Sequence, residues 1–451
     1  MRANQQGLNT AGHNIANVNT EGYTRQKMVL EANDPVKING LVLGTGVNVM
    51  SISRVRDAFL DRQFRDSNQL MGGFQKQADA IEMIEAVINE PGDTGLQQSI
   101  EDYFASLQDL ATNPESSAVR TTVSEQGRSL ARSFNQMWQQ LETIRENKNL
   151  EIIDQVQNVN EILDSVAQLN VHIGKTEALG NQANDLRDNR DRLLDQLSQL
   201  VDISAQEDPA NNTVTVSVSG QAFVVIDSVT HIEARSVNID GKEEIQLYNP
   251  EAKEELSIRG GELFGLVQIR DEMIPEIQGQ LDILAGAIIG EVNTLHRTGF
   301  GLQGSRLSAP TGIDFFVGED ARTIQLSSLI NNDPGNIAAS GSGAAGDNEN
   351  ALQMAMLRNK GVLNGGQFTF EDFLASMAST LGLQGETIQK RLGNQEILVD
   401  NMKNFRESVI GVNMDEELVD LVRFQNAFGA NARVISITNE LMGIVTQLGR
   451  Y

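Results

Sequence analysis

The sequence predicts a mainly α-helical, elongated protein of several domains, with one small β-rich domain. Apolar residues recur at spacings of three and four along most of the 451 residues, most regularly near the two chain ends. Hydrophobic residues make up 40% of the chain, but only 5% of the residues are aromatic. Large globular cores depend on aromatic residues, so this composition indicates thin helical cores in two or three domains. We therefore expect long helices that form coiled-coil-like bundles from both termini.

The chain begins with a helical pattern over residues 1–19. Its apolar positions form one narrow stripe, which consists of Leu8, Ala11, Ile15 and Val18. A stripe of this kind needs a partner helix to be removed from water. The pattern ends at Gly22, a residue that suits a left-handed helix stop, and extended segments follow at 25–30 and 46–54.

Helical patterns dominate from residue 57 to about 201. The longest seam consists of Ile152, Val156, Val159, Leu163, Val166, Leu169 and Ile173. Farther along, Asp185, Asp188, Asp191 and Asp195 alternate with arginines on a single helix. We interpret this pattern as an exposed face with ion pairs between residues three or four positions apart.

The period changes to two after residue 201. Residues 213–218 alternate between apolar and polar, which is typical of a strand and predicts a β-rich domain over 202–260. Helix resumes over 263–297, with Pro275 near a boundary or kink. A glycine- and serine-rich stretch at 340–346 indicates a flexible link, and further helices are predicted at 350–359 and 370–409.

The terminal helix, which follows Gly411, carries two apolar stripes. The first consists of Val434, Ile437, Leu441, Ile444 and Leu448. The second consists of Met414, Leu418, Leu421, Phe428, Ala432, Ile435 and Met442. Together they make more than half of the helix circumference apolar, which predicts burial among several helices. Open seams at both chain ends are typical of a polymer subunit.

Composition and motifs exclude several classes of function. The formal net charge of −26 argues against nucleic acid and anionic membranes as partners, and no segment is long and apolar enough for a membrane span. The absence of cysteine excludes disulfides and thiolate metal sites. The glycine spacing at 299–304 follows a helix rather than a strand, so it indicates a turn. The histidines show no ligand spacing; they are His13, His172, His231 and His296. We expect no enzyme, cofactor or metal.

One short motif carries a resemblance to a known group of proteins. Its residues are Asn14, Ile15, Ala16, Asn17, Gly22, Tyr23 and Arg25. The motif resembles the N-terminal signature of bacterial flagellar rod, hook and hook-associated proteins. Further segments resemble the hook-associated protein 1 family in particular, in order along nearly the whole chain; they lie at 44–49, 186–191, 261–266, 292–296, 411–417 and 424–425.

This resemblance implies a structural protein of the hook–filament junction, secreted through the flagellar type III export pathway without a cleaved signal. The implied partners are copies of the chain in a ring, the hook protein, the second junction protein and a cytoplasmic export chaperone. We expect the assembly and chaperone interface to consist of Leu8, Ala11, Ile15, Val18, Leu421, Phe428, Val434, Ile435, Ile437, Leu441, Ile444 and Leu448. The family usually has a further stretch of helix before the segment that matches Arg2, so we also expect the native N-terminus to extend upstream of Met1.

The expected domain organisation follows from the resemblance and the element order together. We predict a terminal helical inner core over 1–19 and 412–451, and a helical rod over 20–201, 261–300 and 347–411. An outer β-rich domain is predicted over 202–260, and a connecting segment over 301–346. Two alternatives stay open. The chain could be another axial protein, such as the hook protein or the second junction protein, or less readily a secreted hydrolase on an axial scaffold.

Overall fold

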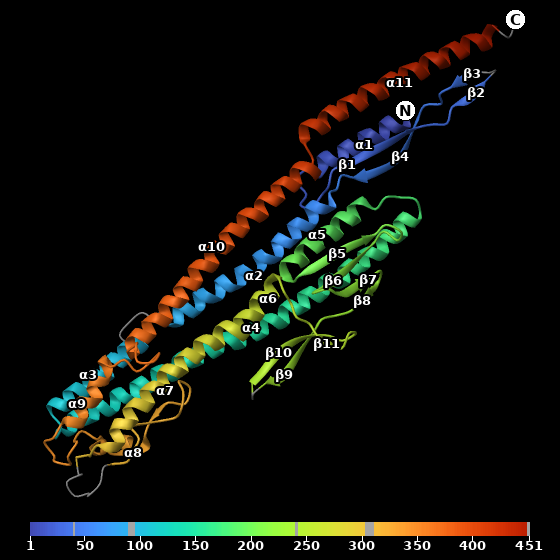
Figure 1. Ribbon diagram of the computed structural model, residues 1–451. Helices are drawn as coiled ribbons and strands as arrows, with labels where there is room; N and C mark the ends of the chain where they lie inside the picture. The colour runs from blue at the N-terminus through green and yellow to red at the C-terminus, as the bar shows by residue number, and fades with distance from the viewer. Residues whose placement is uncertain (39–40, 89–94, 240–241, 303–310, 449–451) are drawn as a thin grey trace. The chain divides into compact units, whose positions relative to one another are not determined.

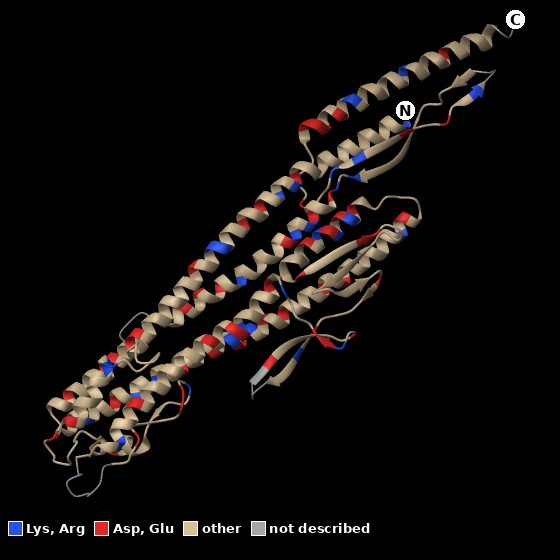
Figure 2. Cartoon of the chain, in the orientation of Figure 1, with Lys and Arg blue, Asp and Glu red and all other residues tan. Residues whose placement is uncertain are grey.

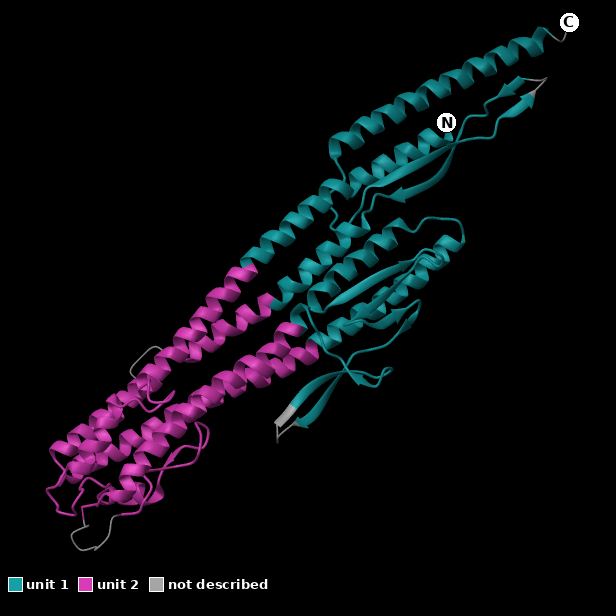
Figure 3. Ribbon diagram, in the orientation of Figure 1, with its two compact units in different colours: residues 1–73, 155–263, 393–451 teal, residues 74–154, 264–392 magenta. Residues whose placement is uncertain are grey.

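The computed structural model describes residues 1–38, 41–88, 95–239, 242–302 and 311–448. The chain divides into two compact units (Figure 3). Unit 1 consists of Met1–Gly73, Gln155–Leu263 and Gly393–Tyr451, and unit 2 consists of Phe74–Asp154 and Phe264–Leu392. The predicted β-rich segment lies within unit 1, whereas the predicted helical rod contributes residues to both units. The division into functional domains stays a prediction.

Long helices dominate the described chain, as the sequence predicts (Figure 1). The α-helices are α1 Arg2–Ala16, α2 Ala58–Ile88, α3 Leu96–Thr112, α4 Ser117–Ala178, α5 Asn184–Leu200, α6 Gly261–Gln268, α7 Ile274–Thr298, α8 Ser328–Asn332, α9 Glu349–Met356, α10 Phe370–Ile410 and α11 Met414–Leu448. A π-helical turn at Ile269–Met273 separates α6 from α7, and Pro275 lies in the first turn of α7. The helix boundary predicted near Pro275 is therefore confirmed. No helix in the described ranges is long and apolar enough to cross a membrane.

Unit 2 has one continuous hydrophobic core, to which α3, α7, α9 and parts of α2, α4 and α10 contribute. Its centre is an aromatic group in which the ring of Tyr103 lies 5.5 Å from Phe315 and 5.4 Å from Phe316. The two phenylalanines precede and begin the short strand β12 (Phe316–Val317), which pairs with β13 (Gln325–Leu326). Residues that sequence reasoning assigned to a connecting segment thus form part of the core.

The predicted flexible link at 340–346 is wrong at its start. The Asp347 carboxylate accepts hydrogen bonds from the Ser340 hydroxyl, the Gly341 amide and the amide and hydroxyl of Ser342. Ser340 is buried and pairs with Phe300 through backbone hydrogen bonds in both directions. One carboxylate therefore fixes a sequence that composition alone assigns to a linker.

Unit 1 contains the predicted β-rich region as two antiparallel sheets. The first has the order β5-β6-β7-β8 and the second β11-β10-β9. The strands are β5 Ile203–Asp208, β6 Thr213–Val218, β7 Gln221–Val225, β8 Ser228–Val229, β9 Glu233–Ile239, β10 Lys242–Asn249 and β11 Glu254–Glu255. The alternation in β6 buries Val214, Val216 and Val218. The period of two therefore predicted this strand correctly.

A second β structure follows α1 in unit 1. Strands β1 (Gln26–Ala32) and β4 (Val47–Arg54) pair antiparallel, and between them β2 (Val36–Ile38) pairs with β3 (Leu41–Leu43). Contacts link α1 to β1, β4 and α11, which lies beside it in Figure 1. The two ends of the chain thus meet in this part of unit 1.

Candidate assembly surface

Helix α11 leaves most of its apolar residues in contact with solvent. Among its described residues only Glu417 is buried. Residues 433–448 are all exposed, and at a rise of 1.5 Å per residue they cover about 24 Å of helix. Their apolar members are Val434, Ile435, Ile437, Leu441, Met442, Ile444, Val445 and Leu448, with exposed fractions between 48% and 71%. Figure 2 shows few charges along this stretch, where only Arg433 and Glu440 are charged.

Helix α1 covers only the first half of α11. The Asn14 side chain contacts Glu417, and a Cβ atom at Gly7 would lie 2.8 Å from the Phe424 ring. The later residue of α1, Asn14, contacts the earlier residue of α11, Glu417, and Gly7 contacts Phe424. The two helices are therefore antiparallel. In the described structure α1 thus lies alongside the first part of α11, and residues 433–448 are exposed. Of the predicted interface residues on α11, only Leu421 and Phe428 are half-buried.

The buried stripe of α1 is not the apolar stripe that the sequence suggested. The residues that lie buried are Ala3, Gly7, Thr10, Ala11 and Asn14, of which four follow a spacing of four, three and four. Small side chains let helices approach closely, and Phe424 fills the space over Gly7. Leu8, Ile15 and Val18 are half-buried, and Ala11 belongs to both stripes. The signal was visible as helical periodicity in small residues, but a search for large apolar residues missed it.

Asn14, which belongs to the N-terminal motif that resembles flagellar axial proteins, connects three segments of the chain. Its amide group donates to the Gln26 carbonyl at 2.9 Å and to Glu417 Oε2 at 3.0 Å. Its oxygen accepts from the Gln26 amide at 3.0 Å and from the Tyr23 hydroxyl at 2.8 Å. Every hydrogen-bonding position of this 1% exposed side chain is therefore used. Burial and the nearby Asp185 and Asp188 carboxylates raise the pKa of Tyr23, so it stays a neutral donor.

The other motif residues hold the backbone between α1 and α11. Arg25 Nε donates to Glu417 Oε1 and its NH1 donates to Glu416, both at 2.7 Å. The Arg25 amide donates to the Ile410 carbonyl at the end of α10. Gly22 has a φ of +77°, so the predicted left-handed turn is confirmed. Ala16 is exposed and Asn17 half-buried, with its side-chain amide on the His13 carbonyl.

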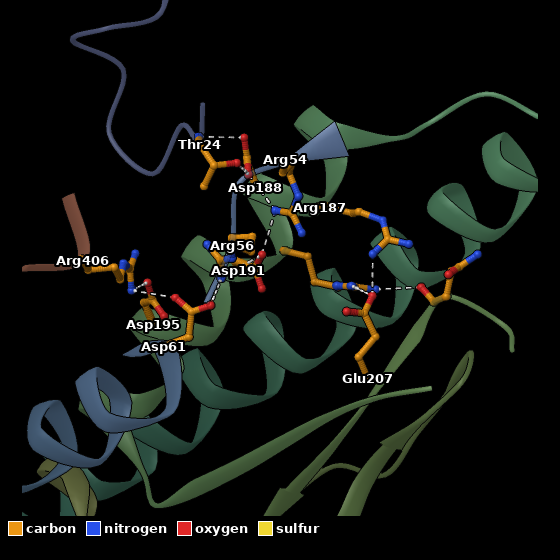
Figure 4. Close-up of polar contacts among 12 residues, drawn as sticks. Thr24, Arg54, Arg56, Asp61, Arg187, Asp188, Asp191, Asp195, Glu207 and Arg406 are labelled. Atoms are coloured by element: carbon orange, nitrogen blue, oxygen red, sulfur yellow. Dashed lines mark hydrogen bonds and ion pairs between the residues drawn. The ribbon is translucent and has the colours of Figure 1, made fainter. Parts of the chain in front are cut away.

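A buried ionic network connects the start of the chain to α5 (Figure 4). Arg54 lies 2.6 Å from Asp188 and 2.8 Å from Asp191. The other Asp188 oxygen accepts from the Thr24 amide at 3.0 Å. The predicted exposed acidic face is therefore wrong for Asp188 and Asp191, which are buried and pair with arginines of other segments, whereas Asp185 is exposed.

The same network extends to α2 and α10. Arg56 bridges Asp61 and Asp191, and Arg406 lies 2.7 Å from Asp195. Burial alone would raise the pKa of Asp191, but the charges of three surrounding arginines hold it well below 3.8. Burial raises the pKa of Asp61, despite its partners. Such a network positions elements, since breaking one buried pair costs about 3–5 kcal/mol.

The β1–β4 hairpin region carries a second exposed apolar surface, which sequence reasoning did not single out. Its members are Val29, Leu30, Val36, Leu41, Val42, Leu43, Val47 and Met50. The sequence feature that could have indicated this surface is the high density of valine and leucine between the two predicted extended segments. Clusters of exposed apolar side chains typically mark contact sites.

The part of the chain that the structure describes offers few candidates for a metal-binding or catalytic site. No group of three or more histidine, aspartate or glutamate side chains there could hold a metal ion. His296 is fully buried: its Nδ1 donates to the Ile313 carbonyl at 2.7 Å, and its Nε2 accepts from the Ala338 amide at 3.0 Å. The last glycine of the 299–304 spacing, Gly304, lies outside the described residues.

These features define a class: an assembly subunit whose paired chain ends offer apolar surface to other molecules. A family model described as the flagellar hook-associated protein FlgK helical domain matches residues 81–316, more than half of the chain. Models of the flagella basal body rod protein and of the C-terminal region of rod FlgEFG proteins match residues 1–24 and 408–448. The chain therefore belongs to the FlgK family, the hook–filament junction proteins of the bacterial flagellum.

Individual relatives agree over nearly the full length. Flagellar hook-associated protein 1 of Bacillus subtilis is 29% identical, with 98% of this chain and 95% of the relative covered. The Escherichia coli protein of the same name is 25% identical over 98% and 96%. The solved flagellar hook junction protein FlgK from Burkholderia pseudomallei superimposes with a TM-score of 0.67 at 15% identity, over 77% of this chain and 100% of that one. The mainly helical fold with small sheets is thus shared, and the chain is a flagellar component.

Proposed function

We propose that this chain is a structural subunit that joins the flagellar hook to the filament as a ring of identical copies. The uncovered apolar half of α11 carries this proposal. The residues of this half are exposed in the described structure, and a helix face that is apolar over a wide arc gains stability when other helices cover it. Burying each large side chain contributes about 1.5–3 kcal/mol. Copies of the same subunit, the hook protein and the second junction protein would supply the cover.

Export through the flagellar type III pathway belongs to the same proposal. The chain has no cysteine, so no disulfide hinders its unfolding for passage through a narrow channel. In the cytoplasm the exposed residues of α11 would favour premature association. A dedicated export chaperone that covers this helix would prevent it, and the same residues would be used again in the ring.

We also propose that the chain has no catalytic role. The histidine contacts that the structure describes are with structural partners; His231, for example, lies 2.9 Å from Asp164. The carboxylates of the buried network are paired with arginines. The alternative of a secreted hydrolase predicts release of soluble fragments when the purified protein is incubated with peptidoglycan.

A gene-deletion strain examined by electron microscopy tests the structural role. We expect hooks without filaments, with flagellin released into the medium, and restoration of filaments when the gene is supplied on a plasmid. Filaments of normal length on the deletion strain would refute the junction role. Loss of the hooks themselves would instead indicate the alternative of a hook protein.

A further inference from the structure

The apolar contacts between α1 and α11 do little to fix the register in which the two helices pack. The buried stripe on α1 consists mainly of small residues, and the large side chain of Phe424 packs over Gly7. A slip of α11 by one turn would present another apolar residue, Leu421 or Phe428, to the same place. Apolar contact alone distinguishes poorly between such registers, whereas one buried polar pair at a helix interface can select one of them.

Glu417 is that buried polar residue. Its side chain is 4% exposed, and it is the single buried residue among those described on α11. One carboxylate oxygen accepts from Asn14 of α1 and the other from Arg25, which follows α1. The neighbouring Glu416 also binds Arg25, but its side chain is 58% exposed. Of these two glutamates, only Glu417 therefore reaches into the interface with α1.

We propose that Glu417 is a positioning residue that fixes the register of α11 against α1, with Asn14 and Arg25 as its partners. In a register that places Leu421 or Met414 where Glu417 lies, the buried Asn14 amide would lose its carboxylate partner, and unpaired polar groups are costly in a buried site. The Arg25 guanidinium, whose side chain is 27% exposed, would lose the same carboxylate. The register decides how much of α11 extends past α1, in steps of about 5.4 Å per turn. It thereby sets which apolar residues are presented for assembly, and in this respect alone the inference rests on the proposed function.

Engineered disulfides can measure the register directly, because the chain has no cysteine of its own. A cysteine replaces Phe424 in every variant, and a second cysteine replaces Gly7 for the observed register, or Ala3 or Ala11 for a shift of one turn either way. With Glu417 present, we expect the Gly7 pair to form at least tenfold faster under mild oxidation of the purified monomer. In the Glu417→Ala background we expect that preference to fall below about twofold, the loss of a difference near 1 kcal/mol.

The Glu416→Ala background is the matched control, since it removes the exposed ligand of the same arginine and should keep the preference. An unchanged tenfold preference in Glu417→Ala would overturn the proposal. If Glu417→Ala abolishes all three cross-links, Glu417→Gln decides, because it keeps the size and one acceptor. Cross-linking with reduced preference in Glu417→Gln would support a register role. Full preference, or no cross-link, would show that Glu417 only attaches the helix. The assay uses monomers, so its outcome is independent of whether the chain assembles at the junction.

Discussion

At the residue scale, four helical asparagines attach β segments in the same manner. Asn14, Asn160, Asn170 and Asn293 each donate from the side chain to a backbone carbonyl and accept from the amide of the same residue. The side chain thus imitates one rung of a β-ladder and satisfies backbone groups that have no strand partner. No spacing rule in the sequence distinguishes these asparagines from solvent-exposed ones, because the partner lies on another segment.

His296 gives unit 2 a pH-dependent stability. Burial lowers the pKa of His296 from 6.5 to about 4, so the unfolded chain binds a proton more readily than the folded one. This stability is complete above pH 6.5 and is lost as the pH falls toward 4. We expect unit 2 to lose about 2 kcal/mol from this group between pH 7 and pH 4.5.

The variant His296→Gln keeps a donor and an acceptor but does not titrate. Urea unfolding followed by the fluorescence of Trp138, the only tryptophan and a member of the unit 2 core, measures both proteins. The difference in unfolding free energy between wild type and variant should shrink by about 2 kcal/mol as the pH falls. A difference that stays constant with pH would contradict the assignment of His296 as a buried neutral side chain.

At the element scale, α11 combines a covered first part with an exposed second part. The covered part is fixed by Glu417 and Phe424, whereas residues 433–448 are all exposed. Helix propensity alone maintains a segment of this length poorly in water. Its apolar residues are therefore better explained by partners than by the fold of the subunit.

A charge placed on the uncovered half should weaken binding to chaperone and copies together. Leu441 is 56% exposed, so Leu441→Asp places its charge at the surface of the subunit rather than in its core. We expect it to weaken chaperone affinity about tenfold or more, because a buried leucine contributes roughly 1.5–3 kcal/mol. Asn439→Asp adds the same charge at an exposed polar position of the same helix and should change affinity less than about threefold. Calorimetry with the purified chaperone measures both; equal affinities of the two variants would refute a shared apolar surface.

At the scale of the whole molecule, the buried side chains are concentrated in one core in each unit. Unit 2 has a continuous buried cluster, and unit 1 buries the seam of α4 against its sheets, with Val159, Leu163 and Val166 at 0% exposure. The surfaces intended for partners lie outside these cores. Local stability follows the density of buried contacts, so the subunit should be stable in parts and open in others.

Hydrogen exchange on the purified monomer tests this distribution. Amides near Val159 and Leu163 should exchange at least a thousandfold more slowly than those of residues 433–448, because the former open only with global unfolding. The Phe104 region of α3 serves as the control in unit 2, where protection should also be strong. Strong protection of 433–448 in a verified monomer would show that α11 is covered by its own chain.

The sequence by itself determined the elements whose evidence is local. The period of two placed the strand at 213–218, and the period of three to four placed the long helices. Gly22 located a turn and Pro275 a helix boundary, because backbone geometry depends on neighbouring residues. Motifs in order along the chain also sufficed for the family. Only the tertiary structure decided what pairs with what: the small-residue stripe of α1, the burial of Asp188 and Asp191 by arginines, and the attachment of Ser340 through Asp347. These outcomes depend on which distant segment lies opposite, and a charge or a serine has the same local pattern whether its partner is water or a buried side chain.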